Sequence, residues 1–512
     1  MSIAVDRSER HVVPRLRDTR SAVALGEVAP LDVAPHVPVS DRERAILQAR
    51  LQEWKVAQSI PFASDAIGTA IALGRPQDAA DVARFVLDLA GGVPALVSRM
   101  ARSVLGIEDE PDAEAPTSEA AGLRGGRVSQ LRHRLRSYGG NALTWLDLAQ
   151  AYASNAQNES ALKAMHVALG LLPDHRLVLR SAARLFVQVG EHDEALWYLR
   201  RSPLTKSDPW LVAAEIAVAE DAGLRSLLAT IGRRMAVSDT FPPFHLSELR
   251  SAVGTMELGS GGSRRARQLL RSSLDSPSEN AVAQAEWVSS MKHISMPLSE
   301  SVLEASTEAL ATDRYAKGDW PEAFALGAKW FEEQPFSSQA VMLTSHMAAT
   351  AGKWYEEVIP MLEFGVRSNS ENWCLWNNLA FCQAMDGRLD DAAETLRHAH
   401  TLVSSDPAGL AFHAATSGLL AFRRGSIDEG RMLYGAAVDT FTRIPGDQRE
   451  NRASAAVYWA QEESRLGNRM RTDVLDMADA LSSHLARPYL RAIMDRVRAS
   501  GSNPGGEVRI VY

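Results

Sequence analysis

Cysteine is almost absent from this chain. Of its 512 residues only Cys374 and Cys382 are cysteines, too few for a disulfide framework, and this scarcity favours a reducing cytoplasm. Long apolar runs are missing as well, because no stretch reaches the roughly 18 uncharged apolar residues that cross a bilayer. The N-terminal residues carry charges every few positions and lack the apolar core of a signal peptide. We therefore expect a cytoplasmic protein without a membrane span or a visible export signal.

An excess of positive charge is also missing. The chain has 55 Lys and Arg against 63 Asp and Glu, a formal net charge of -8, so no global basic field attracts a nucleic acid. The densest basic stretch, residues 124–136, follows six acidic residues and carries an apolar stripe, which favours a solvated helix face. Nucleic acid is therefore a disfavoured partner.

Motifs of the common enzyme classes are absent too. The sequence has no P-loop, no GxGxxG after a strand, no GxSxG and no HExxH. The two cysteines with the nearby His398 and His400 do not suit zinc, because residues eight apart on a helix lie about 80° apart around its axis. We expect no enzyme activity, no cofactor and no metal site.

Apolar residues, by contrast, are plentiful. With 46% hydrophobic and 23% charged residues, the composition is that of an ordinary folded protein. Residues 1–40 are interrupted by four prolines and predict an extended or disordered leader. A capping-box spacing from Ser40 to Glu43 precedes further helical patterns, so 41–107 predicts a small helical domain. Six acids and two prolines predict an acidic linker over 108–120.

The helical pattern after this linker repeats itself. In the segment that starts at Ala142, large, small and aromatic residues fall at fixed positions, and the pattern returns 34 residues later from Arg176 and again from Trp210. Another clear copy starts at Trp373. The pattern is carried by Trp145, Leu148, Ala149, Tyr152, Ala161, Met165, Ala168 and Pro173 in the first copy and by Trp376, Leu379, Ala380, Ala392, Leu396 and Ala399 in the later one.

This spacing resembles that of the tetratricopeptide repeat (TPR) family, over about residues 142–480. The resemblance implies an all-α fold: a right-handed superhelical solenoid of paired antiparallel helices, preceded by the small N-terminal helical domain. The spacing breaks near residue 295, which predicts a first TPR-like arc over 121–295 and a second over 296–500 that ends in a closing helix. A flexible tail is expected over 501–512.

The resemblance also implies a binding surface. In the TPR family the concave groove is lined by fixed positions of the first helix of each unit. Carried over residue by residue, these positions are Arg180, Arg184 and Glu215 in the first arc and Asn377, Asn378 and Phe381 in the second. The lysines of the family's carboxylate clamp have no counterpart here. We expect these side chains to project into the groove and contact a partner.

Two functions remain open from the sequence, with the partner's identity and the oligomeric state unspecified in both. The leading hypothesis is a non-catalytic scaffold or sensor that binds another protein or peptide in its groove, as an accessory subunit of a bacterial complex. The Ala- and Arg-rich composition suits a high-GC bacterium. The alternative is a regulatory subunit whose N-terminal helical domain contacts nucleic acid or an enzyme partner, for example in a stress or phage-defence system.

Overall fold

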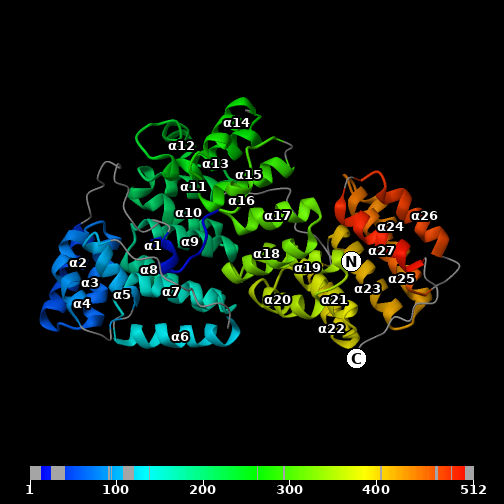
Figure 1. The fold of residues 1–512 in the computed structure, drawn as a ribbon, viewed down its shortest axis with the longest axis horizontal. Helices are drawn as coiled ribbons and strands as arrows, with labels where there is room; N and C mark the ends of the chain where they lie inside the picture. Colours follow the sequence, from blue (N-terminus) through cyan, green and yellow to red (C-terminus); the bar gives the residue numbers. More distant parts are fainter. Residues whose placement is uncertain are drawn as a thin grey trace. The chain divides into compact units, whose positions relative to one another are not determined.

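The structure is a computed structural model, and it describes residues 13–24, 41–89, 93, 95–107, 120–137, 139–261, 263–291, 294–403, 406–466, 471–485 and 487–501. Within these residues every regular element is a helix (Figure 1), so the expected all-α fold is confirmed. The described chain divides into two compact units, an N-terminal unit up to Ser306 and a C-terminal unit from Thr307. The domain boundaries proposed from the sequence remain predictions. Of the predicted acidic linker only Ala120 is described, and of the predicted tail only Gly501.

The N-terminal unit begins with a short helix and a small helical cluster. Its helices are α1 (Thr19–Ala24), α2 (Asp41–Val56), α3 (Ile60–Ala72), α4 (Ala80–Asp88) and α5 (Ala95–Val104), with a 3-10 turn at Pro76–Ala79. Helices α2 to α5 share one apolar core, in which Trp54 packs edge-on against Phe85 with 5.8 Å between ring centroids. This core accounts for the helical pattern seen over 41–107.

Paired helices follow in the same unit. They are α6 (Ala120–Ser137), α7 (Ala142–Ala153), α8 (Asn158–Leu171), α9 (Arg176–Gln188), α10 (His192–Arg201), α11 (Pro209–Asp221), α12 (Ala229–Met235), α13 (Pro243–Gly259), α14 (Ser263–Ser272), α15 (Glu279–Met291) and α16 (Glu300–Leu303), with a 3-10 turn at Pro203–Lys206. Successive helices pack against each other as hairpins, α7 with α8 and α13 with α14 among them. The first helices of the pairs also contact one another, α9 with α11 and α11 with α13.

The C-terminal unit continues the same scheme. Its helices are α17 (Thr307–Lys317), α18 (Trp320–Glu333), α19 (Ser338–Ala351), α20 (Tyr355–Ser368), α21 (Trp373–Met385), α22 (Leu389–Val403), α23 (Pro407–Arg423), α24 (Ile427–Arg443), α25 (Arg449–Leu466), α26 (Arg471–Ser482) and α27 (Pro488–Gly501). Helix α27 stands apart from the pairing and contacts both α19 and α25. The paired-helix, TPR-like arrangement that the spacing predicts is thus confirmed within each unit.

Two repeats, one in each unit, use the same local device to begin their first helix. The side-chain oxygen of Asn141 accepts a hydrogen bond from the N–H of Thr144 at 2.9 Å, and Asn372 caps α21 in the same way. The indole of Trp145 donates to the carbonyl six residues before it at 2.7 Å, and that of Trp376 does so at 2.8 Å. The tryptophans that mark the repeat therefore fix the chain's entry into each first helix.

The approach of the two helices within a pair depends on small residues. Ala161 in α8 and Ala392 in α22 are fully buried at equivalent repeat positions. The turns between helices use glycine in the left-handed region, with φ of 86° at Gly387 and 85° at Gly425, where a side chain would be strained. The sequence spacing therefore reflects a steric requirement of each hairpin.

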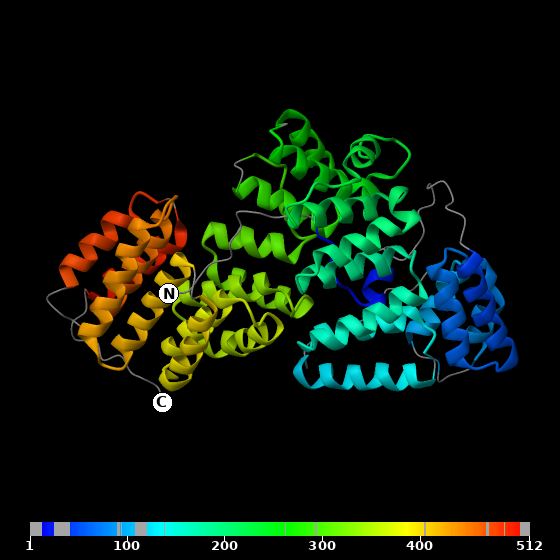
Figure 2. The same cartoon turned by 180° about the vertical axis from the view of Figure 1, so that it is seen from behind.

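The structure describes residues 13–24 of the predicted extended or disordered leader, which we call the N-terminal segment. Residues 13–18 are extended, residues 19–24 form α1, and Leu16 and Ala22 are fully buried. Figures 1 and 2 both show this segment, in dark blue, beside α7. Pro14 and the frequent charges give no helical period, whereas the partners of the segment lie far away in the chain. The rest of the predicted leader lies outside the described residues.

Candidate functional site

Four helices of the N-terminal unit contribute buried polar side chains that contact one another or the chain's N-terminal residues. Asp147 on α7, Arg180 on α9, Glu248 on α13 and Asn280 on α15 are each no more than 9% exposed. Polar groups are rarely buried so deeply unless they are hydrogen-bonded or paired. We call this cluster, together with the adjoining Glu279, the N-terminal groove.

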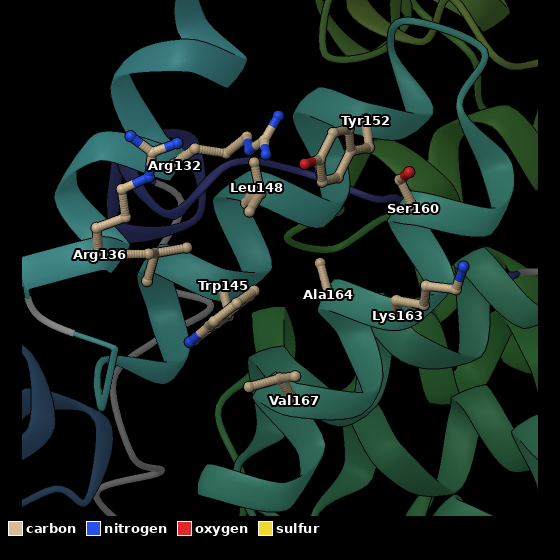
Figure 3. Close-up of a pocket in the computed structure, with 10 residues that line it drawn as sticks. Arg132, Arg136, Trp145, Leu148, Tyr152, Ser160, Lys163, Ala164 and Val167 are labelled. Carbon is tan, nitrogen blue, oxygen red and sulfur yellow. The ribbon is translucent and has the colours of Figure 1, made fainter.

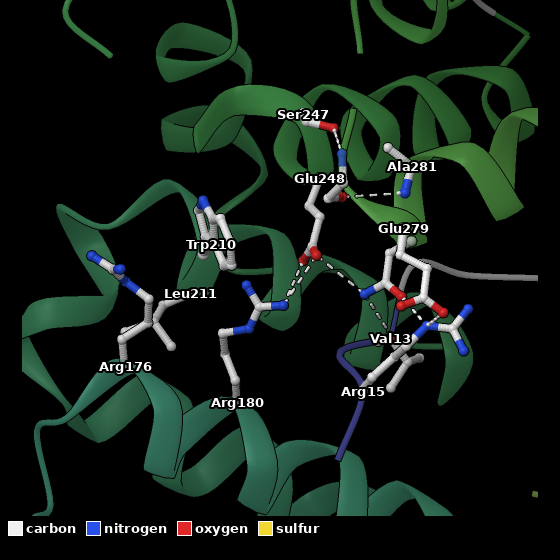
Figure 4. Close-up of polar contacts among 12 residues, drawn as sticks. Val13, Arg15, Arg176, Arg180, Trp210, Leu211, Ser247, Glu248, Glu279 and Ala281 are labelled. Atoms are coloured by element: carbon white, nitrogen blue, oxygen red, sulfur yellow. Dashed lines mark hydrogen bonds and ion pairs between the residues drawn. The ribbon is translucent and has the colours of Figure 1, made fainter. Parts of the chain in front are cut away.

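The N-terminal segment occupies this groove. At the α15 end, the Nε of Arg15 donates to Oδ1 of Asn280 at 2.9 Å and lies 3.0 Å from Oε1 of Glu279. Asn280 in turn donates from Nδ2 to the backbone carbonyl of Val13 at 3.4 Å, and Arg17 pairs with the Glu279 carboxylate. One amide and one carboxylate therefore hold both the backbone and the side chains of the segment (Figure 4).

At the other end, α7 holds the segment through a single carboxylate. Oδ1 of Asp147 accepts hydrogen bonds from both the backbone N–H and the hydroxyl of Thr19, each at 2.7 Å. Burial raises the pKa of Asp147 to about 6, although the bonds from Thr19 act in the opposite direction. The segment is thus attached at α15 and at α7, two helices that lie far apart in the chain.

The neighbouring Asp18 adds an ion pair with α6. Nη2 of Arg127 lies 2.8 Å from Oδ2 of Asp18. Burial would raise the pKa of Asp18, but hydrogen bonds from the N–H of Ser21 and from Arg127 outweigh it and lower that pKa. Asp18 therefore stays ionised and contributes to the attachment of the segment at neutral pH.

A buried ion pair supports the groove from behind. Nη2 of Arg180 lies 3.0 Å from the Glu248 carboxylate, and the guanidinium stands 4.2 Å from the ring centroid of Trp210. Glu248 also accepts a hydrogen bond from Nδ2 of Asn280 at 3.2 Å. Arg180 is therefore linked to the segment through Glu248 and Asn280, along the contacts drawn in Figure 4.

The three first-arc residues that the sequence predicts to project into the groove are buried or half-buried in the structure. Arg180 is buried, and Glu215 is fully buried in a structural contact with Nη2 of Arg200 at 2.8 Å and the N–H of Leu227 at 3.2 Å. Both side chains lie among neighbouring helices and turns, and the role of Arg180 and Glu215 in binding a partner stays a prediction. Arg184 is half-buried and donates to Gln188 at 3.4 Å along α9. The structure does not bring the three together.

The second-arc residues are covered as well. Asn377, Asn378 and Phe381 are buried, and their role in binding a partner stays a prediction. Asn378 donates to the hydroxyl of Ser345 on α19 at 3.1 Å, and the Phe381 ring meets that of Tyr458 on α25 at 5.2 Å. Asn378 thus ties α21 to the first helix of the preceding pair, and Phe381 ties α21 to α25, the first helix two pairs further on.

Helix α27 explains part of this burial. Its Tyr489 ring lies 4.8 Å from that of His346 on α19, and its Arg496 donates to the carbonyl of Thr350. At the other side, the hydroxyl of Ser464 on α25 donates to the carbonyl of Val497 at 3.2 Å. Burial lowers the pKa of His346 to about 4. The chain's own last described helix therefore lies across the first-helix side of the C-terminal unit.

Sequence reasoning missed three residues of the N-terminal groove. Glu248 stands second in the weaker repeat that starts near Ser247, which is a groove position in the TPR pattern, so stricter use of the register would have found it. Glu279 and Asn280 open a helix that lies outside the regular pairing, and no repeat position identifies them. Their role becomes visible only with the segment in place.

A second concave feature lies between α6, α7 and α8. It is a cavity of about 420 Å³ whose floor includes Trp145 and Tyr152 and whose edge carries Arg132, Arg136 and Lys163 (Figure 3). Its charged lining residues are all cationic, which suits an anionic ligand. Two of these cations, Arg132 and Arg136, belong to the basic stretch 124–136, for which the sequence predicts a solvated helix face.

Two kinds of feature are absent from the described residues. Among them, no group of three or more His, Cys, Asp or Glu is placed to hold a metal ion. No helix in the described part of the chain is both long enough and apolar enough to cross a bilayer.

Comparisons with known proteins show only remote likenesses. No family model matches the chain, and no curated protein matches its sequence. Among solved structures, the APC/C hetero-tetramer Cut9–Hcn1 is similar at 13% identity over 90% of this chain and 87% of that one, with a TM-score of 0.36. The human IFIT1 dimer with PPP-AAAA is similar at 11% identity over 93% of this chain and 98% of that one, with a TM-score of 0.31. Yeast Tom70 is similar at 12% identity over 75% of this chain and 93% of that one, with a TM-score of 0.29. At these identities and TM-scores the likeness adds nothing to the account of the groove.

Proposed function

We propose that this protein is a non-catalytic scaffold whose N-terminal groove binds an extended segment of a partner protein. The observation that carries the proposal is the N-terminal segment, whose residues 13–18 are extended and which is bound to α15 through Arg15 and to α7 through Thr19. The groove contacts its backbone at the carbonyl of Val13 and the N–H of Thr19. Backbone contacts of this kind provide affinity for extended peptides, while side-chain contacts provide specificity.

The charge of the groove favours a basic partner segment. Asp147, Glu248 and Glu279 supply three carboxylates, whereas the cluster itself contributes one cation, Arg180, which is paired with Glu248. Complementary charge on a ligand speeds its association and discriminates against acidic competitors. A segment with arginines at the spacing of Arg15 and Arg17 therefore fits this surface.

Within this proposal we place the protein in the bacterial cytoplasm, as an accessory subunit of a larger complex. A chain with only two cysteines, Cys374 and Cys382, suits a reducing compartment, and the Ala- and Arg-rich composition suits a high-GC bacterium. The alternative, in which α2 to α5 contact nucleic acid or an enzyme, has weaker support, because the cationic cavity lies on α6 to α8 instead.

A direct binding measurement tests the proposed function. The probe is a fluorescent peptide of residues 13–24, and the receptor is the full chain carrying Arg15→Glu and Arg17→Glu, which we call the release variant. Two new carboxylates beside Glu279 should drive the chain's own segment out of the groove. We expect a saturable rise in fluorescence anisotropy.

The groove itself provides the control. Adding Glu279→Gln and Asp147→Asn to the release variant removes the carboxylates that bind Arg15 and Thr19, so we expect the peptide's affinity to fall by at least about tenfold. A release variant that keeps its helical circular dichroism but does not bind the peptide contradicts the proposed function.

A further inference from the structure

We propose that the N-terminal segment is a built-in competitor for the N-terminal groove, and that the partner it excludes is a protein segment with the same Arg-x-Arg-x-Thr chemistry as residues 15–19. This inference rests on the proposed function and adds to it the regulation of the groove and the class of its ligand. The segment closes the groove, and an external ligand opens it by displacement.

The contacts of the segment are those of a ligand more than those of a core element. Polar contacts with the groove and with α6 run through side chains and backbone groups between Val13 and Asp18, and through Thr19. Its helix, α1, has six residues, which is too short to be stable without tertiary contacts. Its attachment therefore depends on complementarity with the groove.

The chemistry of the two anchor points defines what replaces the segment. At α15, Asn280 and Glu279 form a site for a guanidinium next to a backbone carbonyl, as Arg15 and Val13 show. At α7, the buried carboxylate of Asp147 accepts a backbone N–H and a hydroxyl from one residue. A ligand must therefore place an arginine four residues before a threonine or serine, in extended conformation.

Removal of the segment leaves a surface that attracts such a ligand. Asp147 and Glu279 each lose the donors that now compensate their desolvated charge. Water then replaces these donors, and the two carboxylates leave a negatively charged surface that favours the binding of a basic segment. The Arg180–Glu248 pair stays in place behind it, because its contacts with α9, α11 and α13 do not involve the segment.

The N-terminal segment competes strongly with an external ligand because it is covalently attached to the groove that it occupies. A ligand within the same chain is present at its site at an effective concentration on the order of millimolar. An external peptide of equal intrinsic affinity must displace it, and at a Kd of about 10 micromolar its apparent binding is weakened by about 100-fold, the ratio of the effective concentration to that Kd. The same peptide binds with its intrinsic affinity once the internal segment has been released.

The test compares the wild-type full chain with the release variant, using the fluorescent peptide of residues 13–24. We expect the release variant to bind the peptide about 100-fold more tightly than the wild type. A matched control carries the same charge change on the exposed face of α14, as Arg264→Glu and Arg265→Glu, and should bind like the wild type. A peptide with Arg15→Ala and Thr19→Ala should bind the release variant at least about tenfold more weakly.

The outcomes separate the two proposals. Equal affinity of wild type and release variant overturns the competitor role but leaves peptide binding intact. Failure of a folded release variant to bind overturns the proposed function and this inference together. Thr19→Val in the full chain provides a milder release, because it removes only the contacts of the hydroxyl with Asp147 and with the carbonyl of Leu143, and its affinity should lie between the other two. An affinity for Thr19→Val equal to that of the wild type contradicts the inference if the release variant fails to fold.

Discussion

Arg180 contacts a carboxylate and an aromatic face at once. Its guanidinium lies 3.0 Å from Glu248 and 4.2 Å from the ring centroid of Trp210, and the side chain is 2% exposed. A buried charge of this kind contributes little net stability as a pair, but removing one partner leaves the other unpaired in a low-dielectric environment. At the residue scale, the N-terminal groove is therefore sensitive to single substitutions behind its surface.

This sensitivity gives a prediction for Arg180→Leu. We expect the free energy of unfolding to fall by about 3–5 kcal/mol, because Glu248 remains buried without its cation. The double variant Arg180→Leu/Glu248→Leu should lose less than the single one. Urea unfolding of the full chain measures both, with the exposed Lys163→Leu as a control expected to stay within about 0.5 kcal/mol. A double variant that is less stable than Arg180→Leu would show that the pair itself is strongly stabilising.

At the scale of elements, close approach between paired helices determines which positions accept a side chain. Gly430 in α24 faces α23, and a Cβ at this position would lie 2.5 Å from Cδ2 of Phe422 and 3.1 Å from the carbonyl of Gly418. Gly435 lies in the same helix, but a Cβ there would meet only the Trp459 ring, at 3.9 Å. The two glycines thus have different roles within one helix.

Alanine substitutions in α24 should therefore have opposite effects. Gly430→Ala is expected to destabilise the protein by about 1–3 kcal/mol, because the added methyl group overpacks the contact with Phe422. Gly435→Ala is expected to stabilise it by up to about 1 kcal/mol, through the higher helix propensity of alanine. Midpoints of urea unfolding provide the comparison, and equal shifts for both variants would refute the close contact between α23 and α24.

At the scale of the whole molecule, the two units contain buried groups that respond to pH in opposite ways. Burial raises the pKa of Asp65 and of Asp147 to about 6 in the N-terminal unit, and lowers that of His346 to about 4 in the C-terminal unit. Between pH 6 and 4 the folded N-terminal unit binds more protons than its unfolded form, whereas His346 binds fewer between pH 6.5 and 4. Acidification therefore stabilises the first unit and destabilises the second through these groups.

Hydrogen exchange tests this prediction in each unit separately. Between pH 7 and pH 5, after correction for the intrinsic exchange rates, we expect protection to rise in helices of the N-terminal unit around Asp65 and Asp147. Protection should fall in α19 and α27 around His346. A change of the same sign in both units would contradict the assignment of these pKa shifts.

The sequence predicts the repeated hairpins well, because their signals are local. Ala161, Ala392 and the two capping asparagines lie within the helices and turns that they determine. The contacts of the N-terminal segment and of α27 could not be predicted in this way. Arg15 meets Asn280 across 265 positions of sequence, and Arg496 meets Thr350 across 146. Such contacts depend on how whole units close, and neither Pro14 nor the charges around it show a pattern that indicates them.

The backbone N–H of Thr19 tests the central claim, that the chain's own N-terminal segment fills the groove. In the structure this group donates to the buried Asp147 at 2.7 Å. Hydrogen exchange should therefore show the Thr19 amide strongly protected in the wild-type chain and exchanging at its intrinsic rate in the release variant. A Thr19 amide that exchanges at its intrinsic rate in the wild type would show that the segment does not occupy the groove.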